Sequence, residues 1–408
     1  MSVEDEASRE VSGFDLRAPP PGFLDNPYPV YRLLRCGDPV RRMPDGSLFL
    51  TRHADLVQVY RDAVTFSSDK RAEFAPKFGA GTPLFAHHTG SLVFNDPPLH
   101  TRVRRLIVGA LTVRAIGAME PGLTALVDSL LDAAEARGRI DAIEDYAAAI
   151  PVEVIGNLLD VPHADRAPLR GWSLAILGAL EPSPTAAQLA LGHRAVDDFV
   201  AYLRVLVAGR RRRPGDPAKD VLTRLIQGED GERLDEAALL QNCIFILNAG
   251  HETITNLIGN ALEALLRFPA ERDRLLAEPA LIRSAVEEFL RFESSNQLGN
   301  RMATVPAEIG GVAVPPGTPI TLCIGAANRD PAVFADPDRL DIGREPNRHL
   351  AFGLGVHQCA GLTLARLEAR IAIGRFLARF PRYEPAGPPV RGGRARFRGF
   401  LSLPMRVT

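Results

Sequence analysis

Apolar residues recur at the three- and four-residue spacing of α-helices over most of the chain. This spacing runs from Leu123 to Ala134, through VDDFVAYLRVLVAG at 196–209, and from Asp235 to Arg267. The last segment is apolar nearly all round at CIFIL, which predicts a long helix that crosses the interior instead of lying on the surface. Gly250 stands in its middle, in the stretch NAGHET, and a helical glycine costs about 1 kcal/mol relative to alanine. We therefore expect a local disturbance with a functional reason at this point.

Strand-like segments are few. They are GSLFLT near residue 49 and EIGGVAVPPGTPITLCI, where Gly310 and Gly311 suit a tight hairpin turn and Pro316 and Gly317 a second turn. The pattern predicts a mainly α protein with small β-sheets. Proline- and glycine-rich stretches are too short and scattered to be interdomain linkers, so we expect one continuous domain over 1–408, with residues 1–20 as a flexible amino-terminal segment.

Composition narrows the functional classes. Of the 408 residues, 46% are hydrophobic and 24% charged, and the formal net charge of -1 argues against binding to nucleic acid or to a membrane surface. The cysteines Cys36, Cys243, Cys323 and Cys359 form no CxxC pair, so neither a disulfide framework nor a thiolate zinc site is indicated. The amino terminus is acidic and polar, unlike a signal peptide, and no apolar run approaches the roughly 18 residues that span a bilayer. We expect a cytoplasmic protein without a membrane anchor.

One cysteine stands in a glycine-rich turn, AFGLGVHQCAGL at 351–362, and four interpretations compete for it. A buried structural cysteine is the ordinary one, because free cysteine behaves as a small hydrophobe. A GxGxxG nucleotide loop fails at Gln358, and a catalytic thiol would need His357, two residues away, as its base. In the fourth interpretation, Gly353 and Gly355 fold the backbone around a thiolate and the following helix directs its positive end at the sulfur. A single thiolate suffices for haem iron, whose equatorial positions belong to the porphyrin.

The stretch FGLGVHQCAG resembles the haem-binding loop of the cytochrome P450 family, FGxGxHxCxG, at every fixed position. The resemblance implies that Cys359 is the proximal ligand of haem b, that Phe352 packs beside it and that His357 reaches a haem propionate. Gly353 and Gly361 are the motif's other cofactor-binding positions. The implied fold is the cytochrome P450 fold, a triangular helix-rich prism with haem between the long central helix and the cysteine loop.

The stretch AGHET, from Ala249 to Thr253, is the second matching segment. By the resemblance, Ala249 and Gly250 lie against the oxygen-binding face of the haem, while Glu252 and Thr253 hold water and carry protons to bound dioxygen. The ordinary alternative is a solvent-facing acid and a threonine that bonds back to its own helix. A zinc-protease HExxH motif is excluded, because Thr255 stands where the second histidine is required.

Two further groups of charged residues fit the same family. Glu288 and Arg291 lie on one helical face, and the resemblance joins them with Arg339 in an internal structural triad, although such a pair is more often a surface ion pair. His100 and Arg104 are one helical turn apart, and the resemblance adds Arg301 as a third partner of the haem propionates. The ordinary alternative for His100 and Arg104 is a solvated basic face.

The implied reaction is monooxygenation, in which one atom of dioxygen enters a C–H bond by hydroxylation or oxidative demethylation. The chain carries no flavin or iron-sulfur motif, so we expect a separate ferredoxin-type electron donor with its NAD(P)H-dependent reductase. A basic patch for that donor is predicted at Arg102, Arg105, Arg366 and Arg370, with solvated helix faces as the alternative. A peroxide-using haem hydroxylase and a non-catalytic haem sensor or carrier stay open as other functions.

Substrate recognition is predicted from the segment SSDKRAEFAPKFGAGTPLFAHHTGSL, which lies where the family has a mobile lid loop. Its cations are either solvated, as loop charges usually are, or capture the carboxylate of a small, aromatic or other acid. The predicted substrate pocket combines lid, long-helix and strand residues: Lys70, Arg71, Lys77, His87, His88, Ile244, Asn248, Gln297 and Leu298.

Overall fold

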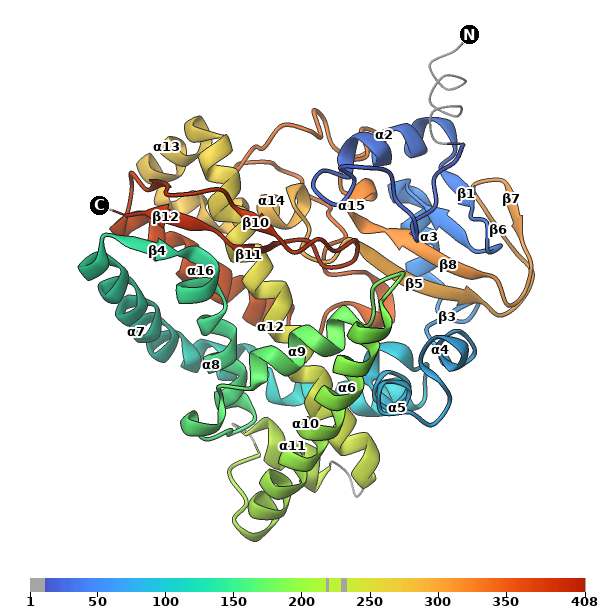
Figure 1. Cartoon of the computed structure of the whole chain (residues 1–408), viewed down its shortest axis with the longest axis horizontal. Coiled ribbons are helices and arrows are strands. Elements are labelled where there is room, and N and C mark those ends of the chain that lie inside the picture. The colour runs from blue at the N-terminus through green and yellow to red at the C-terminus, as the bar shows by residue number, and fades with distance from the viewer. Residues whose placement is uncertain (1–11, 218–219, 229–232, 408) are drawn as a thin grey trace. The chain divides into compact units, whose positions relative to one another are not determined.

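The computed structural model describes residues 12–217, 220–228 and 233–407 (Figure 1). The chain forms two compact units. The first comprises residues 1–68, 259–359 and 390–401, and the second comprises residues 69–258, 360–389 and 402–408. Each unit is built from segments far apart in the sequence, and the single domain over 1–408 stays a prediction.

The first unit contains a five-stranded sheet in the order β1-β2-β8-β5-β3 (Figure 1). β2 and β8 pair in parallel, with Leu48 opposite Ile320, and the other neighbours are antiparallel. Leucine, isoleucine and valine side chains of these strands are buried together with Leu56 and Val59 of α3. Burial of apolar surface stabilises a fold by roughly 25 cal/mol per Å², and this burial holds α3 on the sheet.

Residues 12–20 pack on the first unit. Phe14 and Leu16 are buried in a cluster with Tyr31 and Phe49, and the Phe14 and Phe49 ring centroids are 5.6 Å apart. The predicted flexibility is therefore wrong for this part of the amino-terminal segment, because its two apolar side chains find a core. The rest of that predicted segment, residues 1–11, lies outside the described residues.

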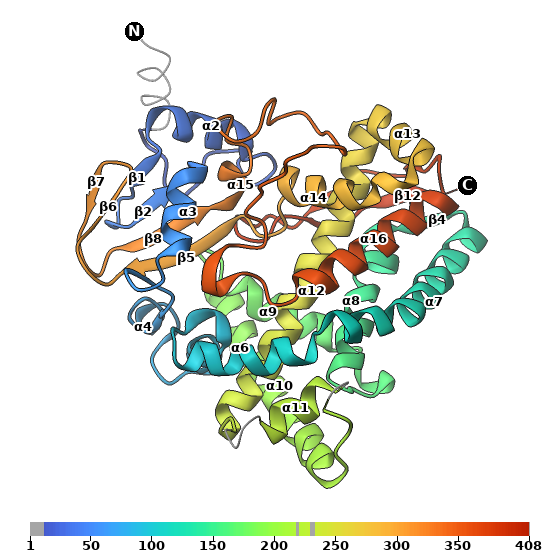
Figure 2. The ribbon, with the colours of Figure 1, turned by 180° about the vertical axis from the view of Figure 1, so that it is seen from behind.

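Long helices dominate the second unit. α7 and α16 lie side by side, in teal and red in Figure 2. α7 begins where the Thr112 hydroxyl accepts a hydrogen bond from the amide of Ala115, and it ends at Gly138, which adopts a left-handed conformation. α10 begins with a reciprocal capping box between Thr185 and Gln188.

The elements of the first unit are α2 (Tyr28–Gly37), β1 (Val40–Arg42), β2 (Leu48–Leu50), α3 (His53–Arg61), β3 (Phe66–Ser67), α13 (Pro269–Ala277), η4 (Pro279–Leu281), α14 (Ile282–Phe292), β5 (Leu298–Ala303), β6 (Ala307–Ile309), β7 (Val312–Val314), β8 (Pro319–Cys323), α15 (Ile324–Ala327), η5 (Gly355–His357), β10 (Val390–Arg391) and β11 (Phe400–Ser402), whose last residue belongs to the second unit. Those of the second unit are α4 (Arg71–Phe78), α5 (Pro83–Gly90), η1 (Leu92–Phe94), α6 (Leu99–Ala110), α7 (Val113–Arg137), β4 (Arg139–Asp141), η2 (Ala142–Ala147), α8 (Ala149–Leu158), η3 (His163–Asp165), α9 (Leu169–Gly178), α10 (Ala186–Arg212), α11 (Val221–Gln227), α16 (Leu362–Arg379), β9 (Glu384–Pro385) and β12 (Pro404–Arg406). The helix α12 (Glu236–Arg267) begins in the second unit and ends in the first.

The mainly α composition with small sheets is confirmed. The predicted long helix appears as α12, and the predicted hairpin joins β6 and β7 through Gly310 and Gly311, both with positive φ. Over the described ranges, no single helix is both long and apolar enough to cross a bilayer, although α6 and α7, bent by 51°, pass that test as a pair.

Candidate active site

The cysteine turn is a tightly hydrogen-bonded loop in the first unit. The Cys359 amide donates to the Phe352 carbonyl at 2.9 Å, and the Gly353 amide donates to the Leu350 carbonyl at 2.8 Å. The Leu350 amide in turn donates to the side-chain oxygen of the buried Asn328 at 2.7 Å. Cys359 itself is partly exposed, and it lies three residues before the first residue of α16. The loop thus fixes the backbone on both sides of a sulfur that other protein atoms do not fully cover.

Glycine is required at position 355 of this loop. Its φ is +73°, and a Cβ added there would lie 2.4 Å from the Tyr60 carbonyl oxygen. Gly353 also has a positive φ, of +63°. The backbone of α3 therefore backs the cysteine turn at a distance that no other residue type permits.

Arg301 lies near the same turn, because it contacts Tyr60. It is buried on β5, its Nη1 donates to the Asn300 carbonyl at 2.7 Å, and its guanidinium lies 5.3 Å from the Tyr60 ring centroid. His357 is half-buried at the end of η5. Both are cofactor-binding predictions, and both belong to the first unit with Cys359.

His100 and Arg104 lie on α6 of the second unit. Their spacing of four residues places them on one face of the helix, and His100 is buried while Arg104 is half-buried. A buried imidazole and a guanidinium one turn apart are suited to an anionic group.

The middle of α12 carries a strip that the protein leaves uncovered. Ala249 is exposed, and Phe245, Ile246, Gly250 and Thr253 are partly exposed, in a helix whose other residues near them are buried. Their three- and four-residue spacing puts them on one face. An apolar face left open inside a core helix is where a flat apolar prosthetic group or a substrate fits.

The polar residues of AGHET lie next to this strip and differ in their surroundings. Thr253 Oγ1 donates to the Ala249 carbonyl at 2.8 Å, and Glu252 is buried. His251 is also buried, and neither ring nitrogen has a hydrogen-bond partner among the residues that the structure describes. Burial lowers the pKa of His251 to about 3, helped by the nearby charge of Arg170. The ring is therefore neutral and faces the core.

Close packing between helices explains the glycine at position 250. A Cβ there would lie 2.3 Å from Ile155 Cδ1, so the glycine allows α8 to approach α12. α12 is one uninterrupted helix from Glu236 to Arg267. The predicted interruption of the helix at Gly250 is not observed, and the threonine bonds back to its own helix as in the ordinary alternative.

The residues present fit a haem. The chain offers a lone cysteine in a rigid glycine turn, an uncovered apolar strip on α12, and buried or half-buried basic side chains at His100, Arg104 and Arg301. None of the four cysteines forms a disulfide. Within the described part of the chain, no group of three or more histidine, cysteine or acidic side chains is placed to hold a metal ion. Iron is therefore expected here only with a ligand that brings its own donor atoms.

The predicted triad needs a correction. Glu288 and Arg291 pair at 2.7 Å and are fully buried, as predicted. The third arginine is Arg344, whose Nε lies 3.1 Å from Glu288 Oε2. Arg339 is wrong for this role, because its guanidinium is 64% exposed and pairs with Asp341 at 2.9 Å. The Arg339 carbonyl accepts from Arg291, which turns the Arg339 side chain outward.

The lid cations are engaged by protein groups. Lys70 is buried and pairs with Glu73 at 2.7 Å, and Arg71 bonds to Asp69 and Asn95. Lys77 Nζ donates to the carbonyls of Leu180 and Glu181, at 3.3 and 2.7 Å, and thereby ties α4 to the end of α9. None of these three arrangements favours the predicted capture of a substrate carboxylate.

Other predicted pocket residues separate into two sets. His87, His88, Ile244 and Asn248 are buried in the second unit, with His87 and Asn248 in contact. Gln297 and Leu298 are instead core residues of the first unit. Gln297 Nε2 donates to the Ser294 carbonyl at 2.7 Å, and Leu298 belongs to the buried cluster around Tyr31. The prediction of a pocket role is therefore not supported for these two, since packing already accounts for them.

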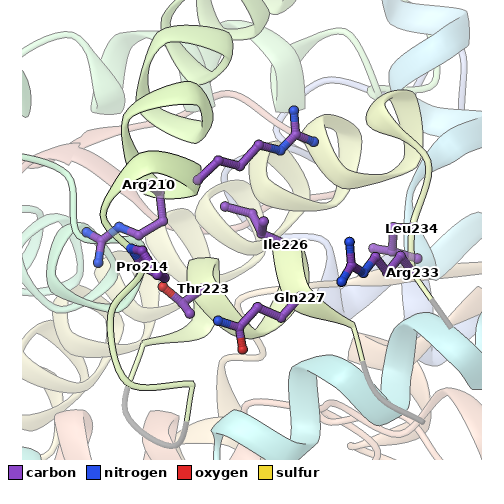
Figure 3. A pocket seen from close by; sticks show the side chains of 8 residues that line it. Arg210, Pro214, Thr223, Ile226, Gln227, Arg233 and Leu234 are labelled. Atoms are coloured by element: carbon purple, nitrogen blue, oxygen red, sulfur yellow. The ribbon is translucent and has the colours of Figure 1, made fainter. Parts of the chain in front are cut away.

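A cavity of about 390 Å³ lies elsewhere in the second unit (Figure 3). It is bounded by the end of α10, by α11 and by the residues just before α12. Its lining residues are Arg210, Arg211, Pro214, Thr223, Ile226, Gln227, Arg233 and Leu234. None of them is a predicted site residue, and Arg210 is held by Asp160 and Asp220. This cavity is separate in composition from the candidate active site.

Sequence reasoning missed three residues that contact predicted site residues or the cysteine turn. They are Tyr60, which backs the cysteine turn, Arg344, which completes the buried triad, and Gln241, which contacts His87. Gln241 had a signal, because it lies seven residues before Asn248 and so on the same face of the predicted long helix.

Comparison with known proteins gives a consistent result. The cytochrome P450 family model matches residues 184–389. A vitamin D(3) 25-hydroxylase of Pseudonocardia autotrophica is 40% identical over 363 residues, covering 88% of this chain and 87% of that protein. A biotin biosynthesis cytochrome P450 of Bacillus subtilis is 36% identical, covering 88% of this chain and 90% of that protein.

Solved structures agree. P450BioI, crystallised in complex with a hexadec-9Z-enoic acid ligated acyl carrier protein, superposes with a TM-score of 0.89 at 33% identity, over 95% of this chain and all of that one. CYP109E1 from Bacillus megaterium, crystallised with testosterone, has a TM-score of 0.86 at 30% identity, over 94% of this chain and 98% of that one.

Proposed function

The chain belongs to the cytochrome P450 family, and from this premise we propose that it uses Cys359 as its haem ligand to oxidise a small organic substrate. It is an oxidoreductase of the monooxygenase class, like the relatives that it resembles over most of its length. We propose haem b as the cofactor and the insertion of one atom of dioxygen into a C–H bond as the reaction, by hydroxylation or oxidative demethylation.

Bound haem supplies the activation of dioxygen. The protein's own residues have three tasks. Cys359 holds the iron, with Gly353, Phe352 and Gly361 shaping the turn around its sulfur. His100, Arg104, Arg301 and His357 neutralise the propionates.

The third task belongs to α12. Ala249 and Gly250 offer a flat surface. Glu252 and Thr253 hold a water molecule and pass protons through that water. The bond from Thr253 to the Ala249 carbonyl is compatible with this role, because the hydroxyl oxygen still has lone pairs to accept from water.

The cysteine turn carries the proposal. It combines the complete FGxGxHxCxG pattern with a positive-φ Gly355 against Tyr60 and an incompletely covered sulfur. The test is the absorption spectrum of the reduced protein with carbon monoxide, which we expect to show the strongly red-shifted Soret band of thiolate ligation. Cys359→Ser should abolish that band while Cys36→Ser, at an exposed cysteine, keeps it. A band that survives in Cys359→Ser would exclude this residue as the ligand.

Electrons are proposed to come from a ferredoxin-type protein and its NAD(P)H-dependent reductase. The two alternative functions make different predictions. A peroxide-using haem hydroxylase would turn over with hydrogen peroxide and not with the donor proteins. A haem sensor or carrier would form no product in either assay, although the carbon monoxide spectrum would be the same.

The contacts of the lid cations weaken the proposal of a carboxylic acid substrate. It was predicted from lid cations that are now seen to be engaged by Glu73, Asp69 and backbone carbonyls. If benzoate-like acids shift the haem spin state and neutral compounds do not, the acid is the substrate class after all.

A further inference from the structure

A polar relay crosses from α5 to α12 in the second unit. His87 Nδ1 lies 3.0 Å from Gln241 Oε1, and His87 Nε2 lies 3.4 Å from Asn248 Nδ2. His87 and Asn248 are each only 2% exposed. Gln241 and Asn248 are two helical turns apart on one face of α12, so both reach the same imidazole.

The direction of the hydrogen bonds in this relay follows from which amide atom faces each ring nitrogen of His87. Burial lowers the pKa of His87 to about 4, so its ring is neutral near pH 7 and has one donor and one acceptor nitrogen. The Gln241 oxygen can only accept, which assigns the proton to Nδ1. Nε2 is then the acceptor, and it receives its hydrogen bond from the Asn248 amide group.

The relay leaves one acceptor unused. Asn248 Oδ1 is buried and has no hydrogen-bond partner among the described residues. An amide oxygen left in this state costs about 1–3 kcal/mol. Asn248 adjoins the uncovered strip of α12, being next to Ala249 and three residues after Phe245. A ligand on that strip therefore lies next to a buried amide oxygen that lacks a donor in the described part of the chain.

We infer that Asn248 selects substrates by accepting a hydrogen bond from a hydroxyl, amine or amide N–H group. This inference rests on the proposed function and specifies its substrate class. His87 and Gln241 are positioning residues, because they hold the Asn248 amide with its oxygen available. A carboxylate is disfavoured at this point, since it has no donor to offer and would lose its own hydration.

The surroundings indicate the rest of the ligand. Next to His87, His88 packs among Phe74, Phe78 and Phe94, with ring centroids 5.2 to 5.8 Å apart. The wall beside the relay is therefore rich in aromatic rings. It suits a neutral, largely apolar molecule with a single donor group.

The test uses the holoenzyme and three matched pairs, each an alcohol and its methyl ether: 4-phenylphenol, dodecan-1-ol and testosterone. Dissociation constants are measured by equilibrium dialysis, which does not depend on a spin-state change. We expect the alcohol of at least one pair to bind about tenfold more tightly than its ether, which corresponds to about 1.4 kcal/mol. Asn248→Leu should reduce that ratio to within about twofold, whereas Asn248→Asp, which keeps an acceptor oxygen, should retain the preference.

Three results would overturn the inference: no alcohol binds, no pair is discriminated by more than twofold, or the preference is unchanged in Asn248→Leu. Tighter binding of the ethers would mean that the relay runs in the opposite direction and offers a donor. The carbon monoxide spectrum of Asn248→Leu should match that of the wild type. A wild type without the thiolate band would refute the proposed haem ligand, while the dialysis ratios would still decide the role of Asn248.

Discussion

Glycine at position 355 is a residue-scale requirement of the cysteine turn. Replacing it with alanine brings a Cβ within 2.4 Å of the Tyr60 carbonyl and strains a φ of +73°. We expect Gly355→Ala to lower the free energy of unfolding by about 1–3 kcal/mol and to weaken haem retention. Gly361→Ala is the matched control, because nothing lies within 4 Å of a Cβ there and its φ is -94°. Equal urea midpoints for the two variants would contradict this account.

Arg344 and Arg339 test which arginine supports the buried Glu288. Removing Arg344 leaves a fully buried carboxylate short of a partner, so Arg344→Ala should destabilise the protein by about 3–5 kcal/mol. Arg339→Ala removes an exposed pair with Asp341 and should cost less than about 1 kcal/mol. Chemical unfolding of the two variants separates the assignments, and a larger loss for Arg339→Ala would restore the predicted triad.

Glu368 on α16 makes stability depend on pH. It is buried, its Oε2 has no hydrogen-bond partner within the described ranges, and burial raises the pKa of Glu368 to about 8 from an ordinary 4.5. Between these two values the folded state holds a proton that the unfolded state has released, so stability falls as pH rises from about 5 to about 8. Unfolding measured at both ends should show a loss of a few kcal/mol, and Glu368→Gln should flatten it. An unchanged slope in that variant would place the effect elsewhere.

The role of a residue could be predicted from the sequence where its partners are close to it along the chain. Cys359 and its glycines form a contiguous pattern, so their turn could be anticipated. The role of Arg344 could not be anticipated, because Arg344 reaches Glu288 only through a turn at 341–343. In that turn the Gly343 amide donates to Asp341. Charge and spacing alone do not distinguish an arginine that points inward from one that points outward.

At the scale of elements, periodicity was informative where helices are long. α12 was predicted within one residue at its start, because its apolar positions repeat over many turns. The short helices α4 and α5 were not predicted. α4 contains Pro76 and α5 begins at Pro83, and both proline positions resemble turn signals in a sequence.

The acid on α12 provides the test at this scale. If Glu252 carries protons, Glu252→Gln should lower the rate of product formation about 100-fold, the lower end of the range for general acid-base catalysis. Glu263→Gln on the same helix is the control, because Glu263 pairs with Arg267 at 3.0 Å and lies in the first unit. The rate of product formation is the measurement. Equal rates for the two variants would remove Glu252 from the proton path.

At the scale of the whole molecule, each unit is assembled from segments distant in sequence. The proposed haem partners follow this division, with Cys359 and Arg301 in the first unit and His100 and Arg104 in the second. Motifs predicted which residues belong to one cofactor, whereas the pattern of apolar positions contained no sign of two compact units. The reason is physical: helical period reports only which face of a segment is buried, not which distant segment covers it.

The predicted donor patch consists of Arg102, Arg105, Arg366 and Arg370, of which Arg370 pairs with Glu120 at 3.4 Å. Arg102 and Arg105 lie on α6, and Arg366 lies on α16, all in the second unit. Electrostatic steering raises association rates 10-fold or more at low salt. We therefore expect the double variant Arg105→Glu, Arg366→Glu to slow the first reduction by a [2Fe–2S] ferredoxin about tenfold in stopped-flow experiments at low ionic strength.

The salt dependence separates docking from a defect in the haem site. Because the Debye length falls to about 3 Å at 1 M, high salt should bring the double variant and the wild type to nearly the same slow rate. Arg212→Glu, at an exposed arginine at the end of α10, should leave the rate unchanged at any ionic strength. An unaltered low-salt rate in the double variant would remove the patch from the docking surface, and a deficit that persists at high salt would mean that the substitutions disturb the electron acceptor itself.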